Sequence, residues 1–199
     1  MSSVAVTATV VDALEACGID YMLVGAFSSN AYGIARATND ADFVVAIKSG
    51  QLHALMQELG AEFALDAQLQ IEGLTGSVRN VITHLRTNFQ IDLFRLNTKD
   101  EHHDERFRRR RRQVLSDIRR EAWIPAVEDV VIQKIRWGRR KDLDDVVNIL
   151  AVSGMGIDWS YLRKWTEKHG TQQQLRKLCD EVPNLMVPEQ FQRDENEPL

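Results

Sequence analysis

Two short apolar runs near the N-terminus, each followed by a helical pattern, restrict the fold of this chain more than any other feature. Residues 21–24 and 42–47 have the length and the apolar character of buried strands. Residues 28–32 leave room for one or two helical turns between them, and residues 51–59 place their leucines and methionine on one helical face. Strand, short helix, strand and helix in this order predict a mixed α/β fold, also described as α+β.

The pattern changes from strands to helices along the second half of the chain. Residues 80–85 and 89–94 flank a polar turn and predict an antiparallel pair of strands. From residue 128 onward the apolar spacing is helical, with Asp142 as the expected N-cap of one helix. Two further helices are expected before residue 181. We therefore predict a mixed sheet with flanking helices, followed by a helical C-terminal part.

These patterns divide the chain into three expected parts. Residues 1–122 form the α/β core, and residues 123–180 form the helical part packed on that core. Residues 181–199 contain three of the four prolines and a charged cluster, which is typical of a loosely ordered tail.

Composition excludes several classes of protein. Hydrophobic residues make up 44% and charged residues 27% of the 199 residues, which is the balance of a globular domain and not of a disordered chain. Cys17 and Cys179 lie far apart, so we expect free thiols in a reducing compartment. The N-terminus lacks the basic residues of a secretion signal, and no apolar run approaches the ~20 residues of a membrane span. A cytoplasmic protein is expected.

The charges are unevenly distributed around a net charge of -4. Residues 1–66 carry two basic side chains against eight acids, whereas residues 106–120 carry eight arginines against one acid. Two interpretations of the densest part, from Arg106 to Arg112, stay open. Arg108 and Arg109 lie one helical turn after acids, which would give a salt-bridged surface. Clustered arginines also bind polyanions, which would give a contact with an RNA or protein acceptor.

Three aspartates form the most informative constellation. Asp40 and Asp42 stand two residues apart at the start of an apolar strand, so both carboxylates face the same side. Their mutual repulsion is relieved by a divalent cation, and Mg²⁺ prefers such hard oxygen ligands. Asp92 lies among apolar neighbours on a later strand and needs either a metal ion or a basic partner. The alternatives are that Asp40 and Asp42 only begin a strand after a turn, and that Asp92 pairs with an arginine, Arg79 or Arg95.

A second group of residues precedes these acids. Gly25 follows the first strand and allows close approach to the backbone, and Ser28 and Ser29 offer hydroxyl groups at the start of a short helix. This is the outline of a phosphate-binding site. The alternative for Ser28 is a plain helix cap without phosphate contact. The chain has no P-loop, no dinucleotide-binding glycine fingerprint and no His-Glu-x-x-His motif, which disfavours the corresponding enzyme classes.

The order of these motifs resembles a known superfamily. Gly25-Ala-Phe-Ser28, then Tyr32-Gly-x-x-Arg-x-Thr-x-Asp40-x-Asp42, then Asp92 on a later strand is similar to the polymerase-beta-type nucleotidyltransferases. Residues 128–134 (Glu-Asp-Val-Val-Ile-Gln-Lys) and 141–145 (Lys-Asp-Leu-Asp-Asp) are more closely similar to small bacterial nucleotidyltransferase-like proteins related to AbiEii-type toxins. The chain departs from the superfamily pattern at Ala26, where Gly or Ser is usual.

The resemblance implies a nucleotidyltransferase fold and a magnesium-dependent transfer of a nucleoside monophosphate from a nucleoside triphosphate to an acceptor hydroxyl. It assigns two Mg²⁺ ions to the aspartates, which are also the catalytic residues, and the triphosphate to a set of loop and helix residues. The metal and catalytic residues are Asp40, Asp42 and Asp92, and the nucleotide-binding residues are Gly25, Ser28, Ser29, Arg36 and Lys134.

Other interpretations remain beside this one. The scaffold would also suit a non-catalytic, antitoxin-like or RNA-binding regulatory protein, or an enzyme that modifies a small molecule. The relation to toxins implies a cognate antitoxin or toxin partner. Lys134 could be a solvated helix residue, and Lys141, Asp142 and Asp145 could serve as a helix cap and a local ion pair.

Overall fold

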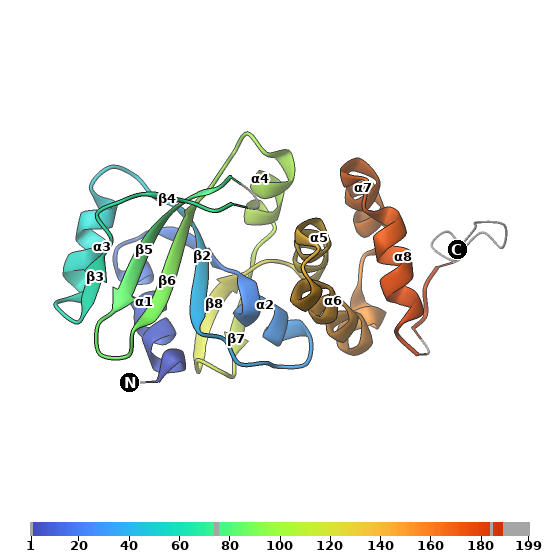
Figure 1. Cartoon of the computed structure of the whole chain (residues 1–199), viewed down its shortest axis with the longest axis horizontal. Helices are drawn as coiled ribbons and strands as arrows, with labels where there is room; N and C mark the ends of the chain where they lie inside the picture. The colour runs from blue at the N-terminus through green and yellow to red at the C-terminus, as the bar shows by residue number, and fades with distance from the viewer. Residues whose placement is uncertain (1, 74–75, 184, 189–199) are drawn as a thin grey trace. The chain divides into compact units, whose positions relative to one another are not determined.

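The computed structural model describes residues 2–73, 76–183 and 185–188 (Figure 1). It contains two compact units, the first made of Met1–Ser28 and Arg36–Ala126 and the second of Ser29–Ala35 and Val127–Leu199. The domain boundary expected after residue 122 falls inside a strand, Arg120–Ile124. Residues 189–199 of the expected tail lie outside the described residues.

The first unit is built on a mixed sheet, as the sequence predicted. Its strand order is β1-β2-β6-β5-β3, with β4 paired to β5. The pair β2 and β6 is parallel, and the other pairs are antiparallel, including the expected pair β5 and β6. The strands are β1 (Asp20–Leu23), β2 (Asp40–Ala46), β3 (Phe63–Leu65), β4 (Gln70–Ile71), β5 (Val78–His84) and β6 (Phe89–Arg95).

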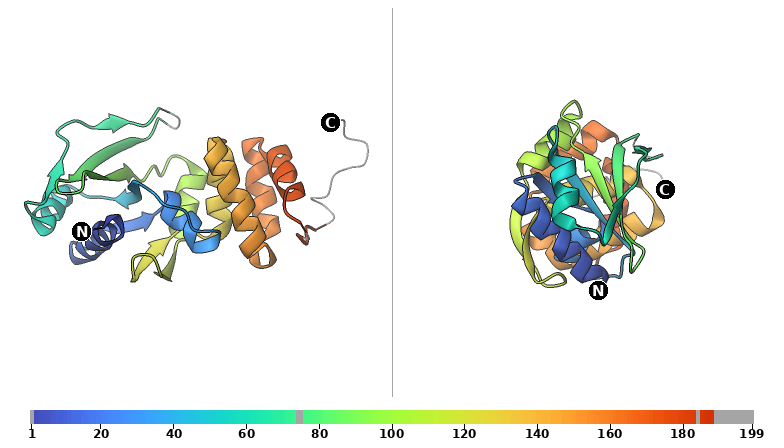
Figure 2. Two further views of the ribbon diagram at one scale, coloured as in Figure 1. Left: turned by 60° about the horizontal axis from the view of Figure 1, so that its bottom comes forward. Right: turned by 90° about the vertical axis from the view of Figure 1, so that its left-hand side faces the viewer.

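Helices cover the two faces of this sheet unequally. Helices α1 (Ser3–Ala16) and α3 (Gln51–Leu59) contact each other and pack on one face (Figure 2). On the other face, α4 (Glu101–Arg108) covers only the apolar end, where its Phe107 packs with Met22 and Val44. The polar end of that face contains the N-terminal half of β2 and therefore Asp40 and Asp42.

A hairpin of two strands completes the first unit and was missed by the sequence analysis. Strands β7 (Arg111–Leu115) and β8 (Arg120–Ile124) pair with each other and form a separate sheet. Leu115, Ala122 and Ile124 are buried, whereas Val114, next to Leu115, is 71% exposed. The strand period is therefore present, but most polar positions of β7 are arginines, and these masked it in the sequence.

The second unit is helical, as predicted. It contains α5 (Val127–Trp137), α6 (Arg140–Ser153), α7 (Trp159–His169) and α8 (Gln172–Asp180), with a short 3-10 turn, Gly154–Gly156, after α6. Trp165, Leu162 and Ile149 are among its buried core residues. The N-cap of α6 is Arg139, so the prediction that Asp142 is the cap was wrong. Asp142 lies in the first turn of the helix and is wholly buried, because its carboxylate forms an ion pair with Lys134.

A short early segment belongs to this helical unit. Helix α2 (Gly25–Tyr32) begins in the first unit and ends in the second. Tyr32 packs against the helical core, and Ser153 donates a 2.6 Å hydrogen bond to the Tyr32 carbonyl oxygen. A Cβ atom added to Gly33 would lie 3.1 Å from the backbone nitrogen of Ile149. The Tyr-Gly pair of the motif therefore docks the chain on α6.

The structure also bears on the expected absence of membrane-spanning helices and on the state of the two cysteines. None of the helices in the described ranges is both long enough and apolar enough to cross a membrane. Cys17 and Cys179 are free thiols, as predicted, and burial raises the pKa of Cys179 to about 12.

Candidate active site

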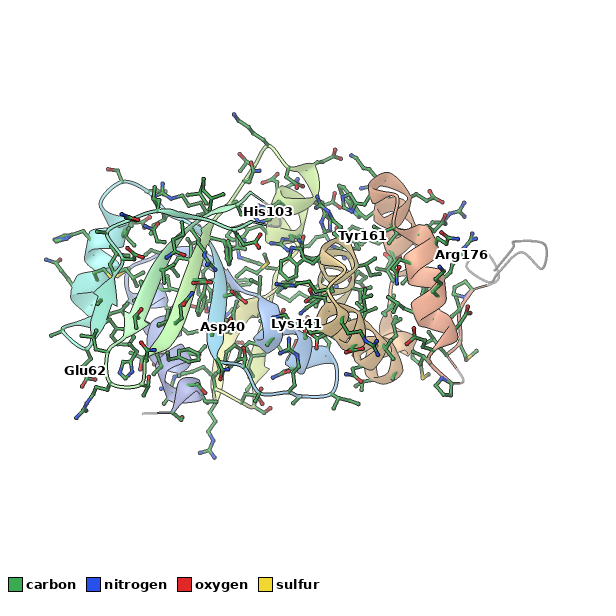
Figure 3. The ribbon with its side chains drawn as sticks, viewed as in Figure 1. Asp40, Glu62, His103, Lys141, Tyr161 and Arg176 are labelled. Atoms are coloured by element: carbon green, nitrogen blue, oxygen red, sulfur yellow. The ribbon has the colours of Figure 1, made fainter. Side chains whose placement is uncertain are left out.

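The three aspartates predicted from the sequence lie on two neighbouring strands of the first unit. In the parallel pair of β2 and β6, Asp42 is opposite Asp92 and Asp40 is opposite Gln90. Side chains alternate along a strand, so these four side chains share one face of the sheet. This is the face that α4 covers only at its other end; Figure 3 labels Asp40 at the start of β2.

Asp40 is exposed and already accepts one hydrogen bond. The Thr38 hydroxyl donates to Asp40 Oδ1 over 2.6 Å and also contacts the Asp40 carbonyl oxygen at 3.2 Å. Thr38 thus fixes the orientation of the carboxylate before the strand begins. The same hydrogen bond sets the orientation of the other carboxylate oxygen, Asp40 Oδ2. The threonine of the Thr-x-Asp pair therefore positions the aspartate of the motif.

Asp42 lies against the backbone of Gly25. The backbone nitrogen of Val24 donates to the Asp42 carbonyl oxygen over 2.8 Å, which holds the end of β1 beside β2. Gly25 has a φ of 63°, and a Cβ atom at this position would overlap the Asp42 carboxylate. Only glycine allows both this backbone conformation and this close approach. The glycine of the motif therefore makes the room in which the Asp42 carboxylate lies.

The two serines after Gly25 are buried in α2. The Ser28 hydroxyl donates to the Gly25 carbonyl oxygen over 3.0 Å, and Ser28 and Ser29 are 2% and 4% exposed. For Ser28 this is the local helix bond that the sequence analysis kept as the alternative. Phosphate binding by Gly25, Ser28 and Ser29 stays a prediction, and it would use the backbone N–H groups at the start of α2.

Asp92 is buried and has two partners of the same unit. Arg79 on β5 forms an ion pair with Asp92 Oδ2, and Gln90 donates to Asp92 Oδ1 over 2.7 Å. Burial raises the pKa of Asp92, the charge of Asp40 raises it further, and Gln90 and Arg79 oppose the shift. The structure thus contains the arginine pair that the sequence analysis gave as an alternative, with Arg79 and not Arg95.

Arg79 is itself held from several sides. Its Nη2 group donates to Gln70 Oε1 over 3.2 Å, and its guanidinium carbon lies 5.8 Å from the centre of the Phe94 ring. Neither Gln70 nor Gln90 was predicted from the sequence as a site residue. Gln90 could have been found, because the strand period puts it on the same face as Asp92; Gln70 could not, since β4 has only two residues and no pattern.

Two of the three aspartates offer ligands that suit a magnesium ion. Asp40 and Asp42 offer carboxylate oxygens on one face and fit a hard divalent cation. Both oxygens of Asp92 already accept from Arg79 and Gln90. Within residues 2–73, 76–183 and 185–188, no group of three or more His, Cys, Asp or Glu side chains is arranged to hold a metal ion. The geometry therefore fits a cation at Asp40 and Asp42, with Asp92 occupied.

Lys134 belongs to the second unit and is buried in an ion network. Its Nζ atom lies 2.6 Å from Asp145 Oδ2 and 3.0 Å from Asp142 Oδ1, and Arg139 Nε lies 2.5 Å from Asp142 Oδ2. Lys134 is 3% exposed, so its interpretation as a solvated residue was wrong. Asp142 and Asp145 do form ion pairs, but their shared partner is Lys134 on the preceding helix and not the local Lys141. A role of Lys134 or of the half-buried Arg36 at a nucleotide stays a prediction.

The acids at the start of α5 tie it to α7. The backbone nitrogen of Asp158 donates to Glu128 Oε1 over 3.0 Å, and the Tyr161 hydroxyl donates to Asp129 Oδ1 over 2.8 Å (Figure 3). The charged residues of the motif at 128–145 thus hold helices of the second unit together.

Most described arginines of the run at 106–112 contact neighbours in their own unit. Arg108 pairs with Asp104 at 3.0 Å, as the helical spacing suggested. Arg110 pairs with Asp20 at 2.8 Å, and its guanidinium carbon lies 4.2 Å and 5.0 Å from the ring centres of Phe107 and Trp123. These contacts favour the salt-bridged surface for this part of the run.

Comparisons with known proteins agree with the arrangement of motifs. The model of a family described as "Nucleotidyltransferase of unknown function (DUF6036)" matches residues 13–181. No curated protein matches the chain significantly. The description does not mention AbiEii-type toxins, so that closer relationship stays a prediction.

Two solved structures have a similar fold. An antigenic nucleotidyltransferase-like protein from Paracoccidioides brasiliensis is 17% identical, with a TM-score of 0.51 over 75% of this chain and 76% of that one. The antibiotic-resistance factor ANT(2'')-Ia is 9% identical, with a TM-score of 0.56 over 87% of this chain and 96% of that one. At these identities the likeness concerns the fold alone.

Proposed function

We propose that this chain, which belongs to the DUF6036 family of nucleotidyltransferases of unknown function, transfers a nucleoside monophosphate from a nucleoside triphosphate to an acceptor hydroxyl. The observation that carries the proposal is the register of β2 and β6. It aligns Asp42 with Asp92 and brings Asp40 to the same face, in a unit whose family and fold are those of nucleotidyltransferases.

Each residue of this face has a distinct part in the proposed reaction. The acceptor oxygen forms a bond to the α-phosphorus, the bond to the bridging oxygen of the β-phosphate breaks, and pyrophosphate leaves. Asp40 and Asp42, together with Asp92, would hold two Mg²⁺ ions, which would supply positive charge at the attacking and leaving oxygens. Asp92 accepts the proton of the acceptor hydroxyl.

The triphosphate would be held next to these acids. Gly25 brings the backbone at the start of α2 next to the Asp42 carboxylate, so phosphate oxygens bound to the first N–H groups of α2 would also be near the metal ions. Arg36 and Lys134 are the proposed charge partners of the phosphates. Lys134 needs to exchange part of its present ion network for such a contact.

The acceptor is a separate part of the proposal. An RNA or protein acceptor would bind along Arg106 to Arg112, of which Arg111 is exposed and has no ion pair to any described residue. A cognate antitoxin or toxin partner would follow if the chain is related to AbiEii-type toxins, as the sequence motifs suggest.

The direct test is transfer of label from each α-labelled triphosphate. The protein is incubated with Mg²⁺ and a cell lysate, and label is measured in protein, RNA and small-molecule fractions. Label in one fraction that disappears with Asp42→Asn supports the enzyme and identifies its acceptor class. No label in any fraction, together with no nucleotide binding by calorimetry, contradicts it and favours the non-catalytic regulatory protein.

A further inference from the structure

Each carboxylate oxygen of Asp92 already accepts from a neighbour, Oδ2 from the Arg79 guanidinium and Oδ1 from Gln90, and Arg79 compensates its charge. We propose that Arg79 is a built-in counter-cation that occupies the position of a divalent cation at Asp92 and must be displaced before Asp92 can act in catalysis. This inference rests on the proposed function, because it concerns the same aspartate. Arg79 is then a positioning residue, because it acts on the reaction only by pairing with Asp92 or releasing it.

The burial of Asp92 explains why a counter-cation is needed. Asp92 is 2% exposed, so water cannot replace the charge compensation that Arg79 provides. A buried carboxylate that loses its only basic partner is strongly destabilised. The protein without metal therefore keeps Arg79 on Asp92, and a divalent cation that arrives there compensates the same charge.

The surroundings of Arg79 allow its side chain to leave Asp92 while it keeps its contacts with Gln70 and Phe94. Its side chain is 23% exposed, and its contacts with Gln70 and with the Phe94 ring do not involve Asp92. Its Nε atom is buried and has no hydrogen-bond partner among the described residues, so one donor of the guanidinium is unused in the present position. A guanidinium that rotates about its stem can satisfy that donor elsewhere.

The charges of the site set an order of events. Asp40, Asp42 and Asp92 carry three negative charges and Arg79 carries one positive charge, so two negative charges remain. One divalent cation at Asp40 and Asp42 balances them without moving Arg79. Asp92 is reached only by a second cation, which gives a site where nucleotide binding precedes activation of the acceptor.

The test is a titration of the full-length protein with Mn²⁺ alone, followed by electron paramagnetic resonance of the free ion. Arg79→Gln removes the competing cation and should tighten binding at Asp92 by about tenfold or more, because a charge in direct contact is worth at least that factor. Arg95→Gln is the matched control, since it removes the same charge from an exposed end of β6. We expect it to change the affinity less than about twofold.

Arg79→Lys keeps the charge but not the forked contact, and its Mn²⁺ affinity should lie between those of wild type and Arg79→Gln. The proposal is overturned if Arg79→Gln binds Mn²⁺ no better than Arg95→Gln, or if no variant binds the ion. If circular dichroism shows that Arg79→Gln is unfolded, Arg79→Lys decides alone, and wild-type affinity contradicts the proposal. Failure of the proposed function would appear separately, as unchanged magnesium-dependent nucleotide binding by Asp42→Asn.

Discussion

Asp42 lies directly opposite Asp92 on two parallel strands, with Asp40 on the same face. This pair of residues therefore links β2 to the strand whose Asp92 forms an ion pair with Arg79. Their environments differ: Asp42 is half-buried beside the Gly25 backbone, whereas Asp92 is almost wholly buried and ion-paired. This difference lets substitutions separate metal binding from proton transfer.

Asp40→Asn or Asp42→Asn should abolish magnesium-dependent triphosphate binding and leave the fold intact. Each change removes a ligand charge, and it also relieves repulsion between carboxylates in the metal-free protein. Calorimetry with and without Mg²⁺, beside a thermal melt, measures both effects. Asp180→Asn, an exposed change on α8, is the control. Unchanged affinity in either variant would rule out a metal site at these two residues.

Asp92→Asn should lower single-turnover transfer by at least about a hundredfold while changing nucleotide affinity far less. The amide keeps the shape of the carboxylate but cannot take the acceptor proton, and general-base help contributes about 10² to 10⁴ in rate. Quenched single-turnover assays and equilibrium binding on the same variant separate the two effects. Full transfer would make Asp92 a structural acid, and equal loss of transfer and binding would indicate a metal or folding role.

Lys134→Met should destabilise the protein by about 3 to 5 kcal/mol, because it leaves the buried carboxylates of Asp142 and Asp145 without their shared cation. Urea unfolding followed by circular dichroism measures this loss. Lys141→Met removes the same charge from an exposed position of the next helix and should change stability by less than about 0.5 kcal/mol. A small effect at Lys134, combined with weak nucleotide binding, would instead assign its charge to the triphosphate.

His103 should make stability fall in mild acid. Burial lowers the pKa of His103 to about 3, with a further contribution from Arg106, against 6.5 for an ordinary histidine. Between pH 6.5 and about 3 the unfolded chain binds a proton that the folded chain does not, so this contribution is complete above pH 6.5 and is lost as the pH falls. His103→Gln should lose less stability than wild type between pH 7 and pH 5 in urea unfolding. The exposed His53→Gln should behave like wild type, and equal pH dependence in all three proteins would refute the assignment.

The elements with a clear period were predicted from the sequence. The buried strands that became β1 and β2, the antiparallel pair β5 and β6 and the helices from α5 onward lie close to their expected ranges. The missed hairpin of β7 and β8 shows the limit of that reasoning. Its Arg112 and Arg120 pair with Glu15 and Asp12, which lie far away in sequence, and local patterning contains no information about such partners.

The candidate site could be predicted only where it depends on a regular strand pattern. Alternation along two strands was enough to bring Asp40, Asp42 and Asp92 to one face. The choice of Arg79 over Arg95 as the partner of Asp92 depends on the register between β5 and β6, which the sequence does not specify. The burial of Lys134 likewise depends on which sides of α5 and α6 meet.

The docking of residues 29–35 on α6 also affects how the chain is made. Tyr32 is synthesised early, but Ser153, which binds its carbonyl oxygen, follows 121 residues later. At roughly 5 to 20 residues per second, a ribosome needs about 6 to 24 seconds to cover that interval. Throughout this time the segment between α2 and the start of β2 has no helical partner. The contact between Tyr32 and Ser153 can therefore form only after the chain has been synthesised at least as far as residue 153.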